Sequence, residues 1–354
     1  MLIKKNLHLK NIDRIRVSEG RDLVNGLRLD RNEKVDNWED DILDQVLKNK
    51  PDCFLSTYPE INTLYKKLSV HLGVDKDQIL LTSGIDGSIK NILEVLCNPG
   101  SNIAVFSPTY AMYQVYCDIF RLNLTPITYD NKYKLSDKDL ENFLNNKPDI
   151  LFIPNPNQPI ESCLTLQELK SLAIRCRNED CILVIDEAYH YFGADSSIPL
   201  LKEFDNVVVL RTFSKAFGMP SIRVGYTVCN QKIMSILSKP RLAHELSSLS
   251  IAIAEYLIEN YHIVKNNCDE IIKSREFLKN ELQNLGLNSY GNNGNYLLIT
   301  FQNDTNVNLI VKKLNDNKIY VKGPWKEPWS KSITISIGPK THMKKFVDNL
   351  SQIM

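Results

Sequence analysis

The chain has 354 residues, and 43 Lys and Arg against 42 Asp and Glu leave a formal net charge of +1. This balance gives no support for binding nucleic acid or a membrane surface through bulk electrostatics, so small molecules are the expected partners. The length exceeds what one hydrophobic core usually covers and favours two domains.

The N-terminal residues and the cysteines favour a cytoplasmic protein. The first eight residues lack the continuous apolar stretch of a signal peptide, and no segment is apolar over the length of a membrane span. The eight cysteines contain no Cys-x-x-Cys pair and are expected to be reduced. The six histidines include no two at helical i, i+4 spacing beside a glutamate, so no metal site is expected.

From about Gln78 onward, short β-branched runs alternate with segments of helical period, which is typical of a parallel sheet covered by helices. The predicted strands are 79–82, 103–106, 150–153, 182–185, 207–210 and 224–229. A capping box at Thr165 and Glu168 predicts the start of a helix between two of them. The apolar face of this helix carries Leu166, Leu169, Leu172, Ala173 and Cys176.

After about Lys239 the pattern changes to long amphipathic helical sequence over 251–285, followed by predicted strands at 296–301 and 333–337 and a helix from Thr341. We therefore expect a large domain at 31–239, and a smaller α+β domain at 1–30 and 240–354. The predicted fold class is α/β, with a mostly parallel central sheet in the large domain.

In open α/β sheets ligands bind at the carboxyl ends of the strands, so the residues that follow each predicted strand belong together. Gly84 follows the first strand and begins a helix, where backbone N–H groups and the helix dipole favour a phosphate. The spacing differs from the Walker and dinucleotide fingerprints, which argues against an NTPase and a Rossmann dehydrogenase. Tyr110 follows the second strand and either stacks on a planar ligand or is a partly buried tyrosine. The turn at 154–159 follows the third and presents amide side chains.

Asp186 lies at the end of the fourth predicted strand. A buried carboxylate is destabilised unless it is paired, and either backbone amides or a protonated pyridine nitrogen would pair it. Tyr189, three residues later, can donate a hydrogen bond to a phenolic oxygen on the same pyridine ring.

Lys215 follows the strand predicted at 207–210. Burial lowers the pKa of a lysine and leaves a neutral amine that can form a Schiff base with an aldehyde, although a lone Ser-Lys more often marks a surface lysine. Thr212, Ser214 and Arg223 beside it are groups that bind a phosphate dianion. Taken with the other strand ends, these groups match pyridoxal 5′-phosphate (PLP).

The chain resembles the fold type I PLP-dependent enzymes, specifically the class I and II aminotransferases of the histidinol-phosphate aminotransferase branch. The likeness runs from about Leu29 to Gly338. Five segments carry it in order: Tyr58-Pro59, Ser83-Gly84-Ile85-Asp86, Pro108-Thr-Tyr-Ala-Met-Tyr113, Asp186-Glu-Ala-Tyr189, and Arg211-Thr-Phe-Ser-Lys-Ala-Phe-Gly218 with Arg223-Val-Gly-Tyr226.

The resemblance implies a role for each matched residue. Lys215 would form the Schiff base with PLP and then carry a proton between Cα and C4′. Asp186 would stabilise the pyridinium, Tyr189 and Asn157 would bind the phenolic oxygen, and Tyr110 would stack on the ring. The implied phosphate ligands are Gly84, Ile85, Asp86, Thr212, Ser214 and Arg223.

The resemblance also implies a homodimer with active sites shared between its subunits. Tyr58 is then expected to reach the cofactor of the other subunit. Such a protein would be a cytoplasmic biosynthetic enzyme with a small-molecule substrate and no nucleic-acid or membrane partner.

The chain departs from the family where the substrate is expected to bind. Pro156-Asn-Gln-Pro-Ile-Glu161 stands for the usual Pro-Asn-Asn-Pro-Thr-Gly, and Asn32-Glu-Lys-Val35 for Asn-Glu-Asn-Pro. The arginine of the family's Leu-Arg-Ile-Thr-Val-Gly, which binds a carboxylate or a substrate phosphate, aligns with Thr334, and a second arginine aligns near Lys322. Arg31 and Lys326 are candidate replacements for anion binding.

The sequence therefore predicts a PLP-dependent aminotransferase that acts on a small polar, phosphorylated amino or keto compound, and the missing arginine argues against histidinol phosphate itself. The alternative is a decarboxylase of a phosphorylated amino acid resembling threonine-phosphate decarboxylase, because the residues that anchor the substrate decide which bond at Cα breaks. A regulatory or binding protein on the same fold is a third hypothesis. The full set of cofactor residues and the lack of an appended DNA-binding segment argue against it.

Overall fold

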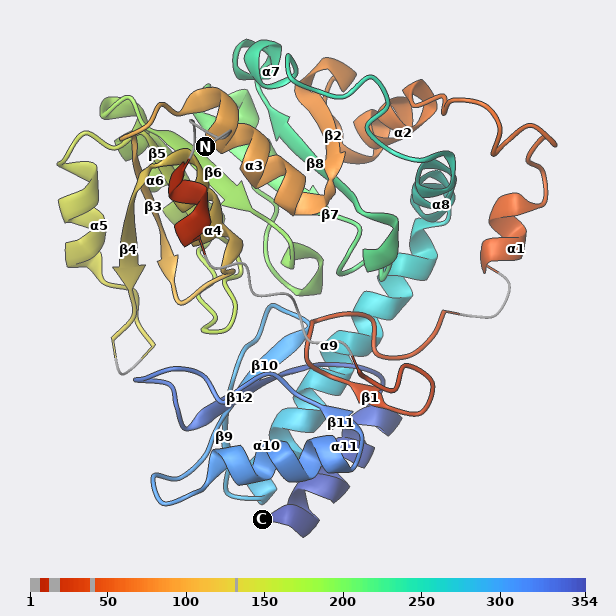
Figure 1. Ribbon diagram of the computed structural model, residues 1–354, viewed down its shortest axis with the longest axis vertical. Coiled ribbons are helices and arrows are strands. Elements are labelled where there is room, and N and C mark those ends of the chain that lie inside the picture. The colour runs from red at the N-terminus through yellow and green to blue at the C-terminus, as the bar shows by residue number, and fades with distance from the viewer. Residues whose placement is uncertain (1–6, 13–19, 39–41, 131–132) are drawn as a thin grey trace.

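The computed structural model describes residues 7–12, 20–38, 42–130 and 133–354. Figure 1 shows a large lobe around a seven-stranded sheet and, below it, a smaller lobe formed mainly by the C-terminal third of the chain. The long helix α9 (Tyr261–Asn284) runs from one lobe toward the other.

The sheet of the large lobe has the order β2-β8-β7-β6-β5-β3-β4 and is parallel except for β8, which is antiparallel to both of its neighbours. Its strands are β2 (Ile79–Ser83), β3 (Asn102–Ser107), β4 (Asn123–Thr128), β5 (Ile150–Pro154), β6 (Ile182–Asp186), β7 (Val207–Thr212) and β8 (Val224–Cys229). The six strands predicted in this region are confirmed. The sequence prediction misses β4, an edge strand that is mostly exposed and contains Pro126, and therefore lacks the buried pattern of the others.

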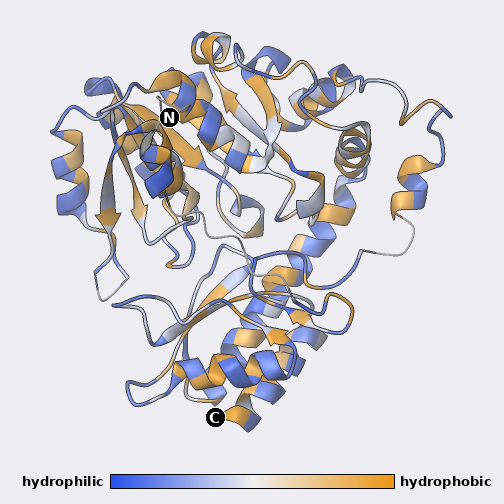
Figure 2. Cartoon of the chain, in the orientation of Figure 1, coloured by the Kyte–Doolittle hydropathy of each residue, from blue (hydrophilic) through white to orange (hydrophobic). Residues whose placement is uncertain are grey.

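Two apolar clusters cover the two faces of this sheet, because alternate strand residues point to opposite sides. Leu80 and Val105 belong to the cluster beneath α3 (Gly84–Leu96), whereas their neighbours Leu81 and Phe106 belong to the larger one. Figure 2 shows the central strands as largely hydrophobic, with mixed surfaces on the outer helices.

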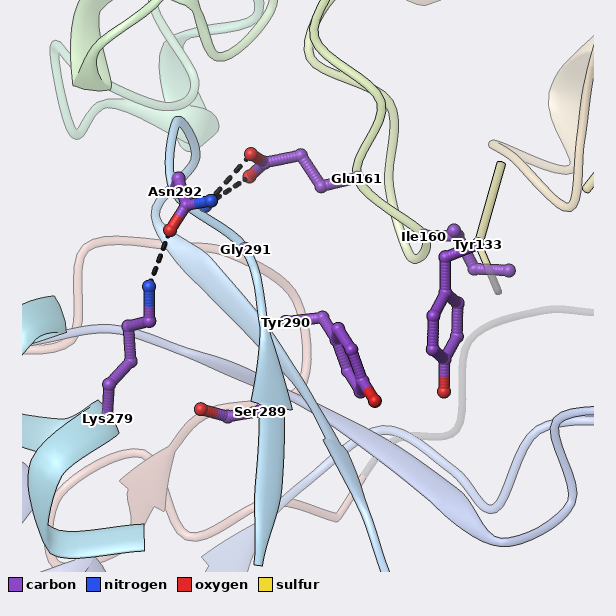
Figure 3. A pocket seen from close by; sticks show the side chains of 8 residues that line it. All are labelled: Tyr133, Ile160, Glu161, Lys279, Ser289, Tyr290, Gly291 and Asn292. Atoms are coloured by element: carbon purple, nitrogen blue, oxygen red, sulfur yellow. Dashed lines mark hydrogen bonds between the residues drawn. The ribbon is translucent and has the colours of Figure 1, made fainter. Parts of the chain in front are cut away.

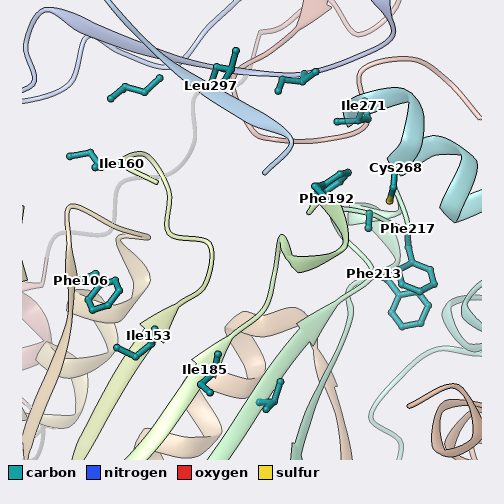
Figure 4. Close-up of a cluster of buried hydrophobic side chains, with 14 of the residues drawn as sticks. Phe106, Ile153, Ile160, Ile185, Phe192, Phe213, Phe217, Cys268, Ile271 and Leu297 are labelled. Atoms are coloured by element: carbon teal, nitrogen blue, oxygen red, sulfur yellow. The ribbon is translucent and has the colours of Figure 1, made fainter. Parts of the chain in front are cut away.

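The larger cluster continues into the small lobe. Phe106, Ile153 and Ile185 on the sheet belong to the same cluster as Cys268 and Leu297 in the small lobe (Figure 4). The helices that cover the large lobe are α1 (Ile42–Leu47), α2 (Asn62–Leu72), α3, α4 (Met112–Phe120), α5 (Asp137–Leu144), α6 (Leu166–Asn178) and α7 (Gln231–Leu237). The capping box predicted for α6 is present, with the Thr165 hydroxyl accepting from the Glu168 N–H at 3.3 Å and the Glu168 carboxylate accepting from the Thr165 N–H at 2.7 Å.

The small lobe contains a three-stranded antiparallel sheet of order β12-β10-β9. The predicted helical stretch 251–285 is divided at Asn260 into α8 (Ser248–Glu259) and α9. The other elements are β9 (Asn288–Tyr290), β10 (Tyr296–Thr300), α10 (Val307–Asp316), β11 (Ile319–Tyr320), β12 (Ser332–Ser336) and α11 (Lys340–Ile353). These confirm the two predicted strands and the helix at the end of the chain.

Segments from the beginning of the chain contact both lobes. β1 (Leu27–Arg28) pairs in parallel with β11 of the small lobe, whereas a 3-10 helix at Leu7–Asn11 contacts α4 of the large lobe. α8, beyond the expected boundary at 239, packs against α2. The division into 31–239 and 1–30 with 240–354 stays a prediction. Among the described residues, no helix combines the length and apolar character needed to cross a membrane.

Candidate functional site

Lys215 lies just beyond β7, in a turn that brings its side chain to the 31–34 segment. Its Nζ donates hydrogen bonds to the backbone oxygens of Arg31 at 3.0 Å and Asn32 at 3.2 Å. The same nitrogen lies 5.5 Å from the ring centre of Tyr189. The amine is therefore held in place by a segment far from its own strand in the sequence.

Burial is the largest influence on this amine, and it lowers the pKa of Lys215 to about 8. The negative charges of Glu33 and Asp186 oppose this effect, whereas the positive charges of Lys322 and Arg223 add to it. Near pH 8 a large share of the amine is neutral and able to attack an aldehyde.

Asp186 ends β6 and is buried. Its Oδ2 accepts a hydrogen bond from the Tyr113 hydroxyl at 2.8 Å, and its Oδ1 accepts from the Ala188 N–H at 3.0 Å. Burial raises the pKa of Asp186 to about 6, the two donors lower it, and the charges of Glu187 and Asp86 raise it further. A positive partner such as a protonated pyridine nitrogen would stabilise this carboxylate.

Tyr113 is a residue whose role the sequence prediction misses. It lies on α4 with its side chain buried and its ring 5.1 Å from that of Phe152. The prediction gives a role to Tyr110 in the same segment and none to Tyr113. The sequence does contain one indication of a role for Tyr113. A buried carboxylate at Asp186 needs hydrogen-bond donors, and a neighbouring element has to supply them.

Replacing Tyr113 with phenylalanine is expected to raise the pKa of Asp186 above about 6, because the ionised carboxylate loses its strongest donor. Pairing with a protonated ring nitrogen requires ionised Asp186, so the affinity of the apoprotein for PLP weakens as pH falls below this pKa. The pH at which this weakening begins is expected to move upward by about one unit. Fluorescence titration of the apoprotein with PLP across a pH series measures it. A Tyr256→Phe control on α8 is expected to leave it unchanged.

Tyr189 and Asn157, the expected partners of a phenolic oxygen, lie in one hydrogen-bonded network. The Tyr189 hydroxyl accepts from Asn32 Nδ2 at 2.9 Å. Asn157 Nδ2 donates to two backbone oxygens, while its Oδ1 is buried without a partner. Tyr296 donates to the backbone oxygen of Asn157 and packs edge-on against Tyr189 at 5.0 Å. Asn32 and Tyr296, from the small-lobe side, are further residues to which the sequence prediction gives no role.

The expected phosphate ligands come from the end of β7, the segment between β7 and β8, and the first turn of α3. Thr212 Oγ1 donates to Ser214 Oγ at 3.0 Å, and Arg223 Nη1 approaches the same Ser214 oxygen at 3.5 Å. Arg223 Nη2 lies 3.8 Å from Asp86 Oδ2 in the first turn of α3. Ile85 occupies the same turn. Two hydroxyls and a guanidinium therefore face the first turn of a helix, an arrangement suited to an anion.

Gly84, the first residue of α3, keeps the space between this helix and Arg223 open. Its φ is +70°, and a Cβ at this position would lie 2.5 Å from Arg223 Nη2. The preceding Ser83 makes no side-chain capping bond to the helix. The cradle at Gly84 thus fits the phosphate of PLP, as the buried Asp186 fits its ring nitrogen.

A Gly84→Ala variant is expected to bind PLP at least about tenfold more weakly, because a left-handed backbone disfavours alanine and the methyl group displaces Arg223. Fluorescence titration of the apoprotein with PLP measures the dissociation constant. Gly73 at the end of α2 offers a matched control, since its φ is +66° but a Cβ added there would meet no atom within 4 Å. Gly73→Ala is expected to lower the unfolding temperature without changing the affinity for PLP.

Tyr110 and Tyr58, the two remaining residues expected to contact the cofactor, lie in different surroundings. The Tyr110 hydroxyl donates to Asp86 Oδ1 at 2.8 Å, so this ring lies beside the phosphate cradle. Tyr58 is 79% exposed, and its ring stacks on His244 at 4.3 Å. Tyr58 makes no described contact with the other residues of the cluster within its own subunit.

The four residues expected to bind the substrate differ in burial and in their contacts. Thr334 on β12 is buried, and its Oγ1 accepts from Trp325 Nε1 at 2.8 Å. Lys322 pairs with Thr334 across a β-bridge and influences Lys215 electrostatically. Arg31 forms an ion pair with Asp30 at 3.3 Å, and Lys326 is exposed one residue after Trp325.

A pocket of about 170 Å³ lies where the loop after β5 meets the small lobe. Figure 3 shows Glu161 directed at the turn that carries Asn292, with Tyr133 and Tyr290 on the other side of the pocket. The Glu161 carboxylate accepts hydrogen bonds of 2.8–3.1 Å from the backbone N–H groups of Asn292 and Asn293 and from the Asn293 side chain. The pocket is separate from the contacts made by Lys215, and Glu161 joins the two lobes at this point.

Comparisons with known proteins agree with this architecture. The family model for aminotransferase class I and II matches residues 24–350. The histidinol-phosphate aminotransferase of Clostridium kluyveri is 27% identical over 332 residues, which are 93% of each chain. That of Buchnera aphidicola subsp. Cinara cedri is 33% identical over 255 residues, covering 70% of this chain and 72% of the relative.

Solved structures show the same fold. Histidinol-phosphate aminotransferase from Sinorhizobium meliloti, in complex with PLP, has a TM-score of 0.84 at 22% identity over 92% of this chain and 90% of that one. L-threonine-O-3-phosphate decarboxylase from Porphyromonas gingivalis has a TM-score of 0.77 at 20% identity over 92% and 98%. The match along nearly the whole chain, together with the cradle at Gly84 and the amine of Lys215, means that the protein belongs to the class I and II aminotransferases and is a PLP-dependent enzyme of the histidinol-phosphate aminotransferase-like branch.

Proposed function

We propose that the enzyme transfers an amino group to or from a small polar, phosphorylated compound, with Lys215 as the residue that carries the covalent chemistry. The observation that carries this proposal is the Lys215 amine, whose pKa is lowered to about 8 and whose Nζ is fixed by two backbone oxygens. The relatives from C. kluyveri and B. aphidicola are named for a phosphorylated compound, which supports that class of substrate.

When bound, PLP supplies an aldehyde that reacts with amines and a ring that accepts electrons from Cα. Asp186 would keep the proton on the ring nitrogen, while Tyr189 and Asn157 would bind the phenolic oxygen and Tyr110 would lie against the ring. Lys215 would supply the amine that binds the aldehyde and, as a free amine, would accept and return the proton at Cα.

The phosphate cradle anchors the cofactor during turnover. In this proposal Thr212, Ser214 and Arg223 bind the phosphate together with the first turn of α3. These groups would hold the phosphate through charge-assisted hydrogen bonds that do not depend on Lys215.

The experiment that tests the proposal mixes the yellow holoenzyme with phosphorylated and unphosphorylated amino donors in the absence of an acceptor. An aminotransferase converts its cofactor to pyridoxamine phosphate, which chromatography of the released cofactor detects. Failure of every phosphorylated amine to produce it, in protein that retains PLP, would contradict the proposed substrate class.

A decarboxylase of a phosphorylated amino acid is the second candidate. It is favoured by Thr334, a neutral side chain where the family carries a carboxylate-binding arginine, because weak anchoring of the carboxylate permits a different bond at Cα to face the ring. Release of carbon dioxide from a phosphorylated amino acid, without any keto acceptor and without pyridoxamine phosphate, would establish this activity instead.

We also propose that the enzyme is a homodimer with shared sites and acts in biosynthesis in the cytoplasm. Large apolar side chains are exposed around Tyr58, on α1 and in the following loop. They include Leu43, Leu47 and Leu55. Burial against a second subunit would remove this surface from water and bring Tyr58 to the partner's cofactor. Mixing Tyr58→Phe and Lys215→Ala proteins tests this, because hybrid dimers should regain one intact site.

A further inference from the structure

The polar face of β12 points toward the residues that hold Lys215. Ser336 Oγ accepts a hydrogen bond from the Asn32 N–H at 2.8 Å, and the backbone oxygen of Asn32 accepts from Lys215 Nζ. Side chains two residues apart on a strand share a face, so Thr334 lies on the same side as Ser336. Thr334 therefore lies on the face of β12 that contacts the segment holding Lys215.

Lys322 lies directly opposite Thr334. The Thr334 N–H donates to the Lys322 backbone oxygen at 2.7 Å, and the Lys322 N–H donates to the Thr334 oxygen at 3.0 Å. Residues paired in this antiparallel manner project from the same face of a sheet. The electrostatic influence of Lys322 on Lys215, after those of burial and Glu33, agrees with this placement.

Trp325 contacts both members of this pair. Its Nε1 donates to Thr334 Oγ1 at 2.8 Å, and its ring centre lies 4.8 Å from Lys322 Nζ. The indole N–H thus holds the Thr334 hydroxyl in a hydrogen bond. The indole ring stabilises the ammonium of Lys322 through a cation–π contact. On this face of β12 the pair consequently presents the flexible point charge of Lys322, where an arginine at position 334 would have presented a planar fork.

We propose that Trp325 determines which anion the substrate carries at this face, admitting the phosphate of a phosphomonoester in preference to the carboxylate of an amino acid. The inference rests on the proposed function and adds to it the residue that sets the preference for a phosphorylated substrate. An ammonium with three rotatable donors suits a tetrahedral dianion, whereas a planar carboxylate gains most from the paired donors of arginine.

The experiment measures binding of two probes, inorganic phosphate and acetate, to the PLP-loaded enzyme by calorimetry. Wild-type protein is expected to bind phosphate at least about tenfold more tightly than acetate, and Lys322→Met is expected to remove most of that advantage. In a Trp325→Ala/Thr334→Arg double variant the preference is expected to shift toward acetate by about tenfold. A matched Trp329→Phe control, whose ring stacks on Tyr133 at 4.9 Å, is expected to keep the wild-type ratio.

A second variant keeps the test decisive if the double variant does not fold. Trp325→Leu removes the ring beneath Lys322 and is expected to weaken phosphate binding about threefold, with little effect on acetate. Equal affinity for the two probes in wild-type protein, or phosphate binding unchanged in Lys322→Met, would overturn the inference. These measurements involve no transfer of an amino group, so they stand or fall separately from the half-reaction that tests the proposed function.

Discussion

Replacing Lys215 with alanine is expected to lower the rate of amino-group transfer by about 10⁴-fold or more, because the variant loses both the covalent attachment of PLP and the group that moves the proton at Cα. PLP should still bind through the phosphate cradle and Asp186, but borohydride should no longer link it to the chain. Mass spectrometry of the reduced protein and single-turnover kinetics measure the two effects.

An exposed lysine provides the control for this substitution. Lys232 lies on the surface of α7, and Lys232→Ala is expected to retain both the borohydride-dependent label and the rate. A Lys215→Ala protein that still yields a reducible link to PLP would show that another amine carries the chemistry. In wild-type apoprotein, the rate of PLP capture should rise with pH through about 8, since the neutral form of Lys215 attacks.

Replacing Glu187 with glutamine is expected to destabilise the fold by about 3–5 kcal/mol, because it leaves the Arg211 cation buried without its partner. Both side chains are almost fully buried, and the Arg211 Nε and Nη2 atoms each lie 2.8 Å from Glu187 Oε2. Glutamine retains an oxygen that can accept from the Ser197 N–H but places an NH2 group opposite the Arg211 donors, so the loss reports both the charge and the lost acceptor. Urea denaturation of the apoprotein measures the change in the free energy of unfolding.

The exposed pair Lys90 and Glu94 gives a matched comparison, since its atoms approach to 2.9 Å in solvent. Glu94→Gln is expected to change stability by less than about 0.5 kcal/mol. Glu187→Gln has a second signature: removing a negative charge beside Asp186 lowers the pKa of Asp186, opposite in direction to the effect of Tyr113→Phe. A loss of stability no larger than that of the surface pair would mean that the buried ion pair contributes little.

The strands of the central sheet are predictable because each is a short apolar run buried on both faces. β4 escapes prediction for the converse reason, since an exposed edge strand does not need that pattern. The reversed direction of β8 is also outside the reach of the sequence, because an apolar strand looks the same in either orientation.

Residues at strand ends can be assigned because parallel strands bring their carboxyl ends to one edge. Contacts that depend on packing between elements distant in the sequence cannot be assigned in this way. Tyr113 reaches Asp186 across 73 positions, and Asn32 reaches Tyr189 across 157. The sequence shows that Thr334 lacks the positive charge of the family's arginine. That the Trp325 indole N–H donates to the Thr334 hydroxyl is evident only from the three-dimensional arrangement.

Glu161 has a mechanical consequence for any movement of the two lobes. Its carboxylate lies in the loop after β5 but binds the N–H groups of residues 292–293, in the turn that leads into β10. A motion that separates the lobes here would break charge-assisted hydrogen bonds, whereas a rotation about this point would preserve them. Opening of the enzyme to admit a substrate is therefore expected to pivot near Glu161, with the largest displacements at the parts of the small lobe farthest from it.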